Sequence, residues 1–537
     1  MVKKGVALLL ACVMLLSFVG CSDAGGEIFG FTLSAEPRQI DPQIAADTAS
    51  LSVIAATFEG LSRLDDDGNA VAGAATWTVS DDGCTYTFTL KESYWSTVTV
   101  RGKETGFEDP VMVTADDFVF GMRRAVMPST ASPYADKLYG IANAKDILTG
   151  KKSADTLGVT AVDDKTVVIT LTAPDPQFVQ KTACPAFMPC NRAFFDYTAG
   201  RYGLEKQYIL TNGAFYVADW KHGENVSLKK NEHYHAAERI LPAAVRYRIG
   251  ADDAENYALL KKEYIDAALI PPAQLADAKA AGIQTVELTD TVRYLWFNQT
   301  DATLANADIR LALRDAIEWQ ALWGTLGAGY VKADGFVAPA ATAGGTIYRT
   351  PQHALPLKTD KDSAKAKLAR GLEILKLNKM PALTILTAED NDSANMARYI
   401  VQSFSKNLDI VCKLESVSRE VLATRVSAGN YQLAIFDVTA GGLTAYENLK
   451  MFTSGGIGNY ARFADAAYDT QYANANDSAA AVQALERALL DACPALPIGF
   501  YTRHYGVAPD VVGVTVRPFN GGAFGALLSF READRIG

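Results

Sequence analysis

The chain has 537 residues, of which 49% are hydrophobic and 10% aromatic, and its formal net charge is −10. A chain of this length and composition can bury a large core and is expected to form roughly two to four domains. The acidic balance argues against nucleic acid or an anionic membrane surface as a partner, because both require a basic patch.

The N-terminus carries an export pattern. Lys3 and Lys4 precede a nearly uncharged run over residues 5–20. This run is long for the core of a signal peptide and shorter than the roughly 20 residues of a membrane-spanning helix. The small Gly20 then stands directly before Cys21, where a peptidase needs room and a thiol can carry lipid.

This arrangement resembles the bacterial lipoprotein signal, in which a diacylated cysteine becomes the first residue after cleavage. The resemblance implies a signal peptide over residues 1–20, a lipid anchor on Cys21 and a tether over residues 21–26. Two fatty chains are enough for stable anchoring, whereas one gives only marginal binding. An ordinary secretory signal followed by a coincidental cysteine is the alternative.

Five further cysteines leave at least one free thiol, because their number is odd: Cys84, Cys184, Cys190, Cys412 and Cys493. Cys184 and Cys190 are close enough in sequence to form a disulfide, and the sequence leaves both the paired and the free state open. No histidine lies near them and their spacing fits no zinc pattern, so we expect no metal site there.

The first half of the chain is predicted to contain strands. CTYTFTL (84–90) alternates strictly and is typical of a half-buried strand, and KTVVITL (165–171) is rich in β-branched residues. Between them, residues 116–127 are predicted to form a helix that is capped by Thr114 and begins with acidic residues.

The second half is predicted to be richer in helix, with amphipathic segments over 308–323, 392–408 and 479–493. For the second of these helices the expected cap is Asp392 or Ser393. Buried strands over 382–388 and 431–438 lie between the helices, and this order predicts a parallel sheet. Ligands of such sheets usually bind at the carboxyl ends of the strands, where Asp437 is expected.

The sequence carries no enzyme motif. It contains no G-x-S-x-G, no H-E-x-x-H, no phosphate-binding loop and no G-x-G-x-x-G that opens a helix. His233 and His235 could share one face of a strand and bind a metal, but no third ligand is evident, so we expect a surface turn. We therefore expect a protein that binds its ligand without reaction.

Short motifs follow one another along the chain: IDP (40–42), FEGL (58–61), SDDGCTYTFTLKESYWS (80–96), VTADDF (113–118), APDP (173–176), NGAFY (212–216), YLWFN (294–298), DIRLALRDAI (308–317) and NYARFADAAYD (459–469). In this order they resemble the extracytoplasmic solute-binding subunits of ABC importers, in the large family (family 5) that binds oligopeptides and dipeptides. The resemblance extends over nearly the whole chain after Cys21.

The resemblance implies an α/β fold of the type II periplasmic-binding-protein kind, a two-lobed clamp with an inserted subdomain. The implied division is a discontinuous lobe I over 27–60, 177–290 and 499–537, an inserted subdomain over 61–176, and lobe II over 291–498. Clamps of this kind close over a ligand by hinge motion.

In peptide-binding relatives, an aspartate in a strand-end Ala-Asp-Tyr segment neutralises the peptide ammonium. AIFDVTAG (434–441) falls at the corresponding place, with Asp437 in the position of the acid and Val438 in that of the tyrosine. We expect Asp437→Ala to leave the fold intact and to weaken peptide binding by at least about a hundredfold, because a buried ion pair is broken. A strand-end turn or helix cap is the structural alternative for this residue.

The resemblance also places other residues near the ligand. Asn212, Gly213 and Phe215 are expected by the cleft in lobe I, and Trp296 and Tyr501 are expected to form walls of the pocket. No metal or other cofactor is expected.

The function implied is a lipid-anchored subunit that captures short peptides for a membrane permease and its ATPases, as a monomer on the outer face of the cytoplasmic membrane. Two alternatives remain open. The same fold could bind a nickel complex, an opine, haem or an oligosaccharide, or the chain could be a surface peptide receptor. The sequence does not reveal the preferred peptide length or the importer.

Overall fold

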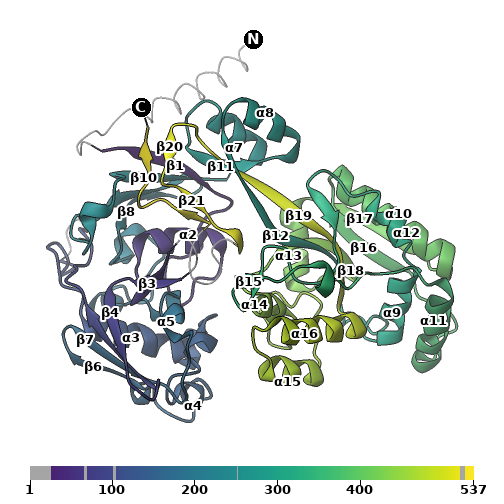
Figure 1. Cartoon of the computed structure of the whole chain (residues 1–537), viewed down its shortest axis with the longest axis horizontal. Coiled ribbons are helices and arrows are strands. Elements are labelled where there is room, and N and C mark those ends of the chain that lie inside the picture. The colour runs from purple at the N-terminus through teal and green to yellow at the C-terminus, as the bar shows by residue number, and fades with distance from the viewer. Residues whose placement is uncertain (1–25, 66–68, 101–103, 251, 520–526, 537) are drawn as a thin grey trace.

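The computed structural model describes residues 26–65, 69–100, 104–250, 252–519 and 527–536. They form two lobes on either side of the long strands β12 (Gln284–Phe297) and β19 (Ala495–Val507) (Figure 1). The predicted signal peptide and Cys21 lie outside the described residues. Within the described ranges, no helix combines the length and the apolar composition that crossing a bilayer requires.

Lobe I is built on a four-stranded sheet with the order β1-β10-β9-β8, in which β1 and β10 run parallel. Its main elements are β1 (Ile28–Leu33), α2 (Thr48–Thr57), α5 (Phe178–Lys181), α6 (Arg192–Tyr197), β8 (Phe215–Lys221), β9 (Asn225–Lys230), β10 (Ala244–Ile249), α7 (Asp253–Leu260), β11 (Ala267–Ile270) and α8 (Leu275–Ala280). Short strands near the C-terminus complete it: β20 (Val511–Val512), β21 (Thr515–Val516), β22 (Leu528–Ser529) and β23 (Asp534–Arg535).

The inserted subdomain contains an antiparallel sheet with the order β4-β5-β7-β6. Its elements are β2 (Ser62–Leu64), β3 (Ala70–Ala72), β4 (Ala75–Val79), β5 (Thr85–Leu90), α3 (Ala115–Val126), α4 (Ala144–Leu148), β6 (Val159–Asp163) and β7 (Thr166–Thr170). The two predicted strands and the predicted helix are confirmed. Thr114 caps α3 in a capping box with Asp117, as the sequence indicated.

In lobe II the strands β16, β17 and β18 run parallel, and β18 pairs with β12. The predicted strands over 382–388 and 431–438 are confirmed as β16 and β18, whereas β17 was not predicted. The elements of lobe II are α9 (Ala307–Ala316), α10 (Trp319–Trp323), β13 (Tyr330–Lys332), β14 (Thr342–Ala343), β15 (Thr346–Ile347), α11 (Lys361–Leu375), β16 (Leu383–Ala388), α12 (Asn391–Leu408), β17 (Cys412–Val417), α13 (Arg419–Ala428), β18 (Leu433–Thr439), α14 (Ala445–Leu449), α15 (Ala466–Asn474) and α16 (Ala479–Ala492).

Two details of lobe II differ from the prediction. The expected single helix over 308–323 is broken at Ile317, where the backbone is extended. The cap of α12 is Asp390, whose Oδ1 accepts a hydrogen bond of 2.8 Å from the Ser393 amide, so Asp392 and Ser393 lie inside the helix.

The chain crosses between the lobes in the middle of β12 and β19. The apolar core of lobe I includes Leu288 of β12 and Tyr505 of β19. The two apolar cores of lobe II include the other part of each strand, with Val292 and Phe500 in one core and Leu295 and Ile498 in the other. The register of β12 against β19 shifts between Leu288 and Thr291, and such a bulge bends a strand. These two strands therefore connect the two lobes.

All five cysteines beyond Cys21 are free thiols. Cys184 and Cys190 are fully buried, and burial raises the pKa of each to about 12. The two thiols that the sequence left open are thus unpaired and held in their neutral form. Among the described residues, no group of three or more His, Cys, Asp or Glu side chains is arranged to hold a metal ion.

Candidate functional site

The carboxyl ends of parallel strands from both lobes lie near β12 and β19. In lobe I these are the ends of β1 and β10, and in lobe II the ends of β16, β17 and β18 (Figure 1). Ligands of open α/β sheets bind outside such ends. The candidate site is therefore the face of the sheet where β18, β12, β19 and β13 meet.

Asp437 lies on this face, opposite Arg293 in the pairing of β18 with β12. The Arg293 Nε donates to Oδ1 at 2.6 Å and Nη2 donates to Oδ2 at 2.9 Å, so the pair is bidentate. The Arg293 side chain is 6% exposed, while that of Asp437 is 32% exposed. The carboxylate can thus be reached from solvent, but its charge is already balanced by a buried guanidinium.

Tyr330 and Tyr501 complete the cluster. The Tyr330 hydroxyl donates to Asp437 Oδ2 at 2.6 Å and accepts from Arg293 Nη2 at 2.5 Å. The ring of Tyr330 stacks on that of Tyr501, its partner across β13 and β19, with centroids 4.6 Å apart. Burial and then the charge of Asp437 raise the pKa of Tyr330, so this hydroxyl stays protonated and remains a donor.

The backbone makes room for these rings. A Cβ at Gly499 would be in ordinary van der Waals contact, at 3.4 Å, with Cδ1 of the Tyr330 ring. Gly329, with φ of +85°, lies so close to Tyr501 that a Cβ would approach Cε2 of its ring within 2.8 Å. Gly329 therefore leaves the space that the ring of Tyr501 occupies, and its positive φ also favours glycine.

One hydrogen-bond donor of the Arg293 guanidinium is not used within the cluster. Among the described residues its Nη1 atom is buried and has no hydrogen-bond partner. Burial alone would lower the pKa of Arg293, but the carboxylate of Asp437 overcomes this and raises it. The cluster therefore offers a carboxylate edge toward solvent and an unused donor behind it.

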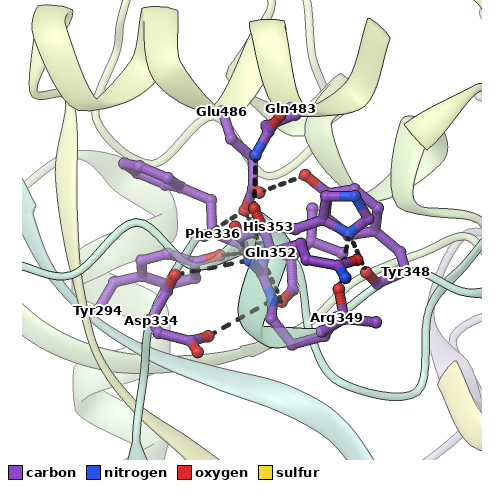
Figure 2. Close-up of polar contacts among 11 residues, drawn as sticks. Tyr294, Asp334, Phe336, Tyr348, Arg349, Gln352, His353, Gln483 and Glu486 are labelled. Carbon is purple, nitrogen blue, oxygen red and sulfur yellow. Dashed lines mark hydrogen bonds and ion pairs between the residues drawn. The ribbon is translucent and has the colours of Figure 1, made fainter. Parts of the chain in front are cut away.

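A buried carboxylate fixes the segment that follows β13. Glu486 on α16 accepts hydrogen bonds at Oε1 from the amides of Phe336 and Val337, at 2.7 and 2.9 Å, and from Arg349 Nη2 at 2.6 Å. The hydroxyl of Tyr348 donates to Oε2 at 2.8 Å. Figure 2 shows these groups converging on Glu486, which anchors residues 333–353 beside the strand of Tyr330.

The residues predicted for lobe I serve the interior of that lobe in this structure. Asn212 is 2% exposed and exchanges two hydrogen bonds with the backbone of Glu59, at 3.1 and 2.9 Å. A Cβ on Gly213 would lie 2.6 Å from the Thr57 carbonyl group, and Phe215 is fully buried. None of the three forms a hydrogen bond, ion pair or ring contact with the Asp437 cluster, whereas Tyr501 belongs to it. Trp296 is fully buried against Phe452, so it presents no ring surface to a cleft here.

The expected surface turn is confirmed for His233, which is exposed in a turn, but not for His235, whose side chain is mostly buried. Its side chain is 6% exposed, and its Nε2 lies 2.5 Å from Oε2 of the buried Glu59. Tyr234 and Arg531 contact the other oxygen of that carboxylate, at 2.6 and 2.9 Å. His235 and Tyr234 are therefore part of a buried polar network around Glu59.

A separate cavity of about 710 Å³ lies between α3 of the inserted subdomain and α6 of lobe I. Its wall contains the buried ion pair of Arg124 and Asp41, whose Nη2 and Oδ2 are 2.7 Å apart. No residue of β12, β19 or lobe II lines it. It is therefore distinct from the Asp437 cluster, which is the better candidate because both lobes meet there.

Sequence reasoning missed Arg293 and Tyr330. The signal for Arg293 was present, because a charged residue within the buried run TVRYLWF (291–297) requires a partner. Nothing local indicated Tyr330, which reaches Asp437 only through the tertiary placement of a three-residue strand.

Comparisons with known proteins agree with this architecture. The family model of bacterial extracellular solute-binding proteins, family 5 Middle, matches residues 71–460. The dipeptide-binding protein DppE of Bacillus subtilis is 26% identical, over 90% of this chain and 88% of its own length.

Two solved structures are informative about shape. Listeria monocytogenes OppA bound to peptide is 25% identical and superposes with a TM-score of 0.79, covering 96% of this chain and 100% of that one. The unliganded open form of the murein tripeptide-binding protein MppA is 26% identical, and the match covers 95% of this chain and 98% of that one. Its TM-score is only 0.61. The lobes here are thus arranged more like those of the peptide-bound protein, and the predicted two-lobed clamp is confirmed.

Proposed function

Because the chain belongs to the family 5 bacterial extracellular solute-binding proteins, we propose that it is the lipid-anchored peptide-binding subunit of an ABC importer. Proteins of this family are transport binding proteins and not enzymes, and this chain is one of them. In the proposed cycle it captures a short peptide between its lobes, closes by bending β12 and β19, and delivers the peptide to a membrane permease.

The observation that carries the proposal is the Asp437 cluster at the junction of the lobes. A peptide presents a charged ammonium, a polar main chain and variable side chains, so tolerant binding depends on its ends and its backbone. Asp437 offers a solvent-accessible carboxylate edge for the ammonium, and the stacked Tyr330 and Tyr501 form a rigid wall beside it. The likeness to a peptide-bound relative supports the same ligand class.

The remaining parts of the proposal come from the sequence. We propose the division into lobe I (27–60, 177–290 and 499–537), inserted subdomain (61–176) and lobe II (291–498), with Asn212, Gly213 and Phe215 supporting the lobe I wall and Trp296 supporting β12 from behind. Lipid on Cys21 would hold the protein, as a monomer, at the outer face of the cytoplasmic membrane. No cofactor is required for this role.

The proposal is tested by identifying what the protein carries. Protein purified without added ligand is denatured, and the released small molecules are identified by mass spectrometry. We expect peptides of a few residues, which titration calorimetry should show to rebind the emptied protein. Release of a nickel complex, an opine or an oligosaccharide, with no binding of peptides, would overturn the proposed ligand.

A further inference from the structure

The carboxylate of Asp437 has little acceptor capacity left for a ligand. An ionised carboxylate offers about four positions to hydrogen-bond donors, two on each oxygen. Arg293 Nε fills one position on Oδ1 at 2.6 Å. Arg293 Nη2 and the Tyr330 hydroxyl fill both positions on Oδ2, at 2.9 and 2.6 Å. A single position on Oδ1 therefore remains for a donor from the ligand.

The charge of Asp437 is balanced as well. Arg293 stands opposite it in the pairing of β12 with β18, and both oxygens of the carboxylate accept from the same guanidinium. A cation that approaches Asp437 is attracted by the carboxylate and repelled by the guanidinium, so its net attraction is much smaller than that to an unpaired acid. The pair thus offers a hydrogen-bond acceptor with little net charge.

A ligand cannot readily take the place of Arg293. The side chain is 6% exposed, and its guanidinium carbon lies 4.1 Å from the centroid of the Tyr330 ring, which in turn stacks on Tyr501. In the sheet, Arg293 lies between Asp437 of β18 and Gly499 of β19. An ammonium that displaced the guanidinium would leave a buried charge without a partner, which is strongly unfavourable. The pair therefore persists when a ligand binds.

We infer that the pair of Arg293 and Asp437 makes the amine subsite neutral, so that the protein takes peptides with an acylated amino end about as well as free peptides. The amine subsite is here the free acceptor position on Asp437 Oδ1. This inference rests on the proposed function and widens the class of ligand that it includes. The amide N–H of an acylated end supplies the single donor that fits this position, whereas an ammonium brings three donors and a charge that the pair does not require.

Arg293 is then the residue that sets the ligand class. Without it, Asp437 would carry an uncompensated charge and would offer an acceptor position on each oxygen in place of the two guanidinium bonds. Both changes favour an ammonium over an amide N–H, because hydrogen bonds between two charged groups are the stronger ones. The Tyr330 hydroxyl would still donate to Oδ2. Removal of Arg293 should therefore create a preference for the free amine.

The test compares the wild type, Arg293→Met and the control Arg425→Met. Arg425 of α13 forms a similar bidentate pair with Glu415, through Nη1 at 2.5 Å and Nη2 at 3.1 Å, and Glu415 lies on β17, which does not pair with β12. The probes are alanine peptides of two to six residues and their N-acetylated forms. Titration calorimetry gives the ratio of the affinities for the free and the acetylated peptide of each length.

We expect the wild type to bind the free and the acetylated peptides within about tenfold of each other. Arg293→Met should shift this ratio toward the free peptides by about tenfold or more, since a charged partner then meets an unpaired carboxylate. Arg425→Met should leave the ratio within about twofold of that of the wild type.

The outcomes separate the two proposals. A wild-type preference for the free peptides that exceeds about tenfold, or an unchanged ratio in folded Arg293→Met, would overturn this inference and leave the proposed function intact. The wild-type ratio decides even if Arg293→Met does not fold. If the wild type binds neither series of peptides, the proposed function fails as well.

Discussion

Lys137 of the inserted subdomain and Glu447 of lobe II form an ion pair across the two lobes, with Nζ and Oε1 2.7 Å apart. The contact is reciprocal, because Asp136 pairs with Lys450 beside it. Both members of the first pair are mostly buried, at 16% and 22% exposure. Burial alone would lower the pKa of Lys137, but Glu447 raises it to about 12, so the lysine is charged at neutral pH. These pairs join the inserted subdomain to lobe II without involving β12 or β19.

Loss of this contact should favour the open form. Lys137 is the better residue to change, because Glu447 also completes the capping box of α14 with Thr444. We expect Lys137→Met to weaken ligand binding roughly three- to tenfold, since only the closed form loses the pair, and to increase the radius of gyration of the unliganded protein in small-angle X-ray scattering.

A matched control is Lys165→Met, which removes a lysine of the same subdomain that pairs with Glu92 at the surface, at 48% and 61% exposure. This variant should behave like the wild type in both measurements. An unchanged radius and an unchanged affinity for Lys137→Met would show that the bridge does not hold the lobes together.

Local patterns predicted much of the fold. The alternation in 84–90 and the buried run over 431–438 correspond to β5 and β18, and Thr114 caps α3. The break between α9 and α10 was not predictable in this way. There the Thr359 hydroxyl donates to the Ile317 carbonyl at 2.7 Å and accepts from the Trp319 amide at 3.1 Å, so a distant residue replaces the helical hydrogen bonds.

The candidate site was predictable only in part. The position of Asp437 near a strand end followed from the order of the elements, but its partner did not, because the register of β18 against β12 joins residues 144 positions apart. The burial of Trp296 and His235 depends equally on remote contacts, with Phe452 and Glu59. Residue types along one segment carry no information about such pairings.

The ion pair changes what a substitution at Asp437 should do. The sequence alone predicts that Asp437→Ala leaves the fold intact, but the structure shows that the change would leave Arg293 buried without a counter-charge. Breaking a fully buried pair costs about 3–5 kcal/mol. Because Asp437 is 32% exposed, we expect Asp437→Asn to lower the free energy of unfolding by about 2–3 kcal/mol, measured by denaturant titration, and also to weaken peptide binding.

A second variant separates stability from binding. Adding Arg293→Met to Asp437→Asn removes the unpaired guanidinium, so most of the lost stability should return while the affinity for peptide stays low. If Asp437→Asn alone is as stable as the wild type, the guanidinium finds another partner. If the double variant binds peptide normally, Asp437 has no part in the site.

Glu59 should make lobe I sensitive to acid. Burial by itself raises the pKa of this carboxyl, but Arg531, His235 and Tyr234 together lower it to about 2. The folded protein therefore keeps Glu59 ionised at a pH where the unfolded chain has already taken up a proton. The stabilisation, up to about 3 kcal/mol, is complete above pH 4.5 and is lost as the pH falls toward 2.

Denaturant titrations at several pH values check this assignment. The free energy of unfolding of Glu59→Gln should lie well below that of the wild type at pH 7, and the difference should shrink between pH 4.5 and pH 2.5. The control Glu238→Gln changes an exposed acid whose nearest base is Arg239 at 3.9 Å, and it should follow the wild type. A difference for Glu59→Gln that is constant with pH would mean that the carboxylate charge contributes nothing.

Glu486 should be the most sensitive acid of lobe II, because it is fully buried and accepts hydrogen bonds from two amides, a hydroxyl and Arg349 (Figure 2). In Glu486→Gln a carbonyl oxygen can still accept from the amides, but Arg349, 7% exposed, keeps only Asp334 at 3.6 Å as a counter-charge. We expect a loss of about 2–4 kcal/mol in the free energy of unfolding, from the guanidinium left with a poor partner. The control Glu318→Gln changes an acid that is 27% exposed and pairs with Lys361 and Lys406. This change should lower the free energy of unfolding by less than about 1 kcal/mol. Equal losses for the two variants in denaturant titrations would mean that the anchor of residues 333–353 depends on hydrogen bonds alone and not on the buried charge.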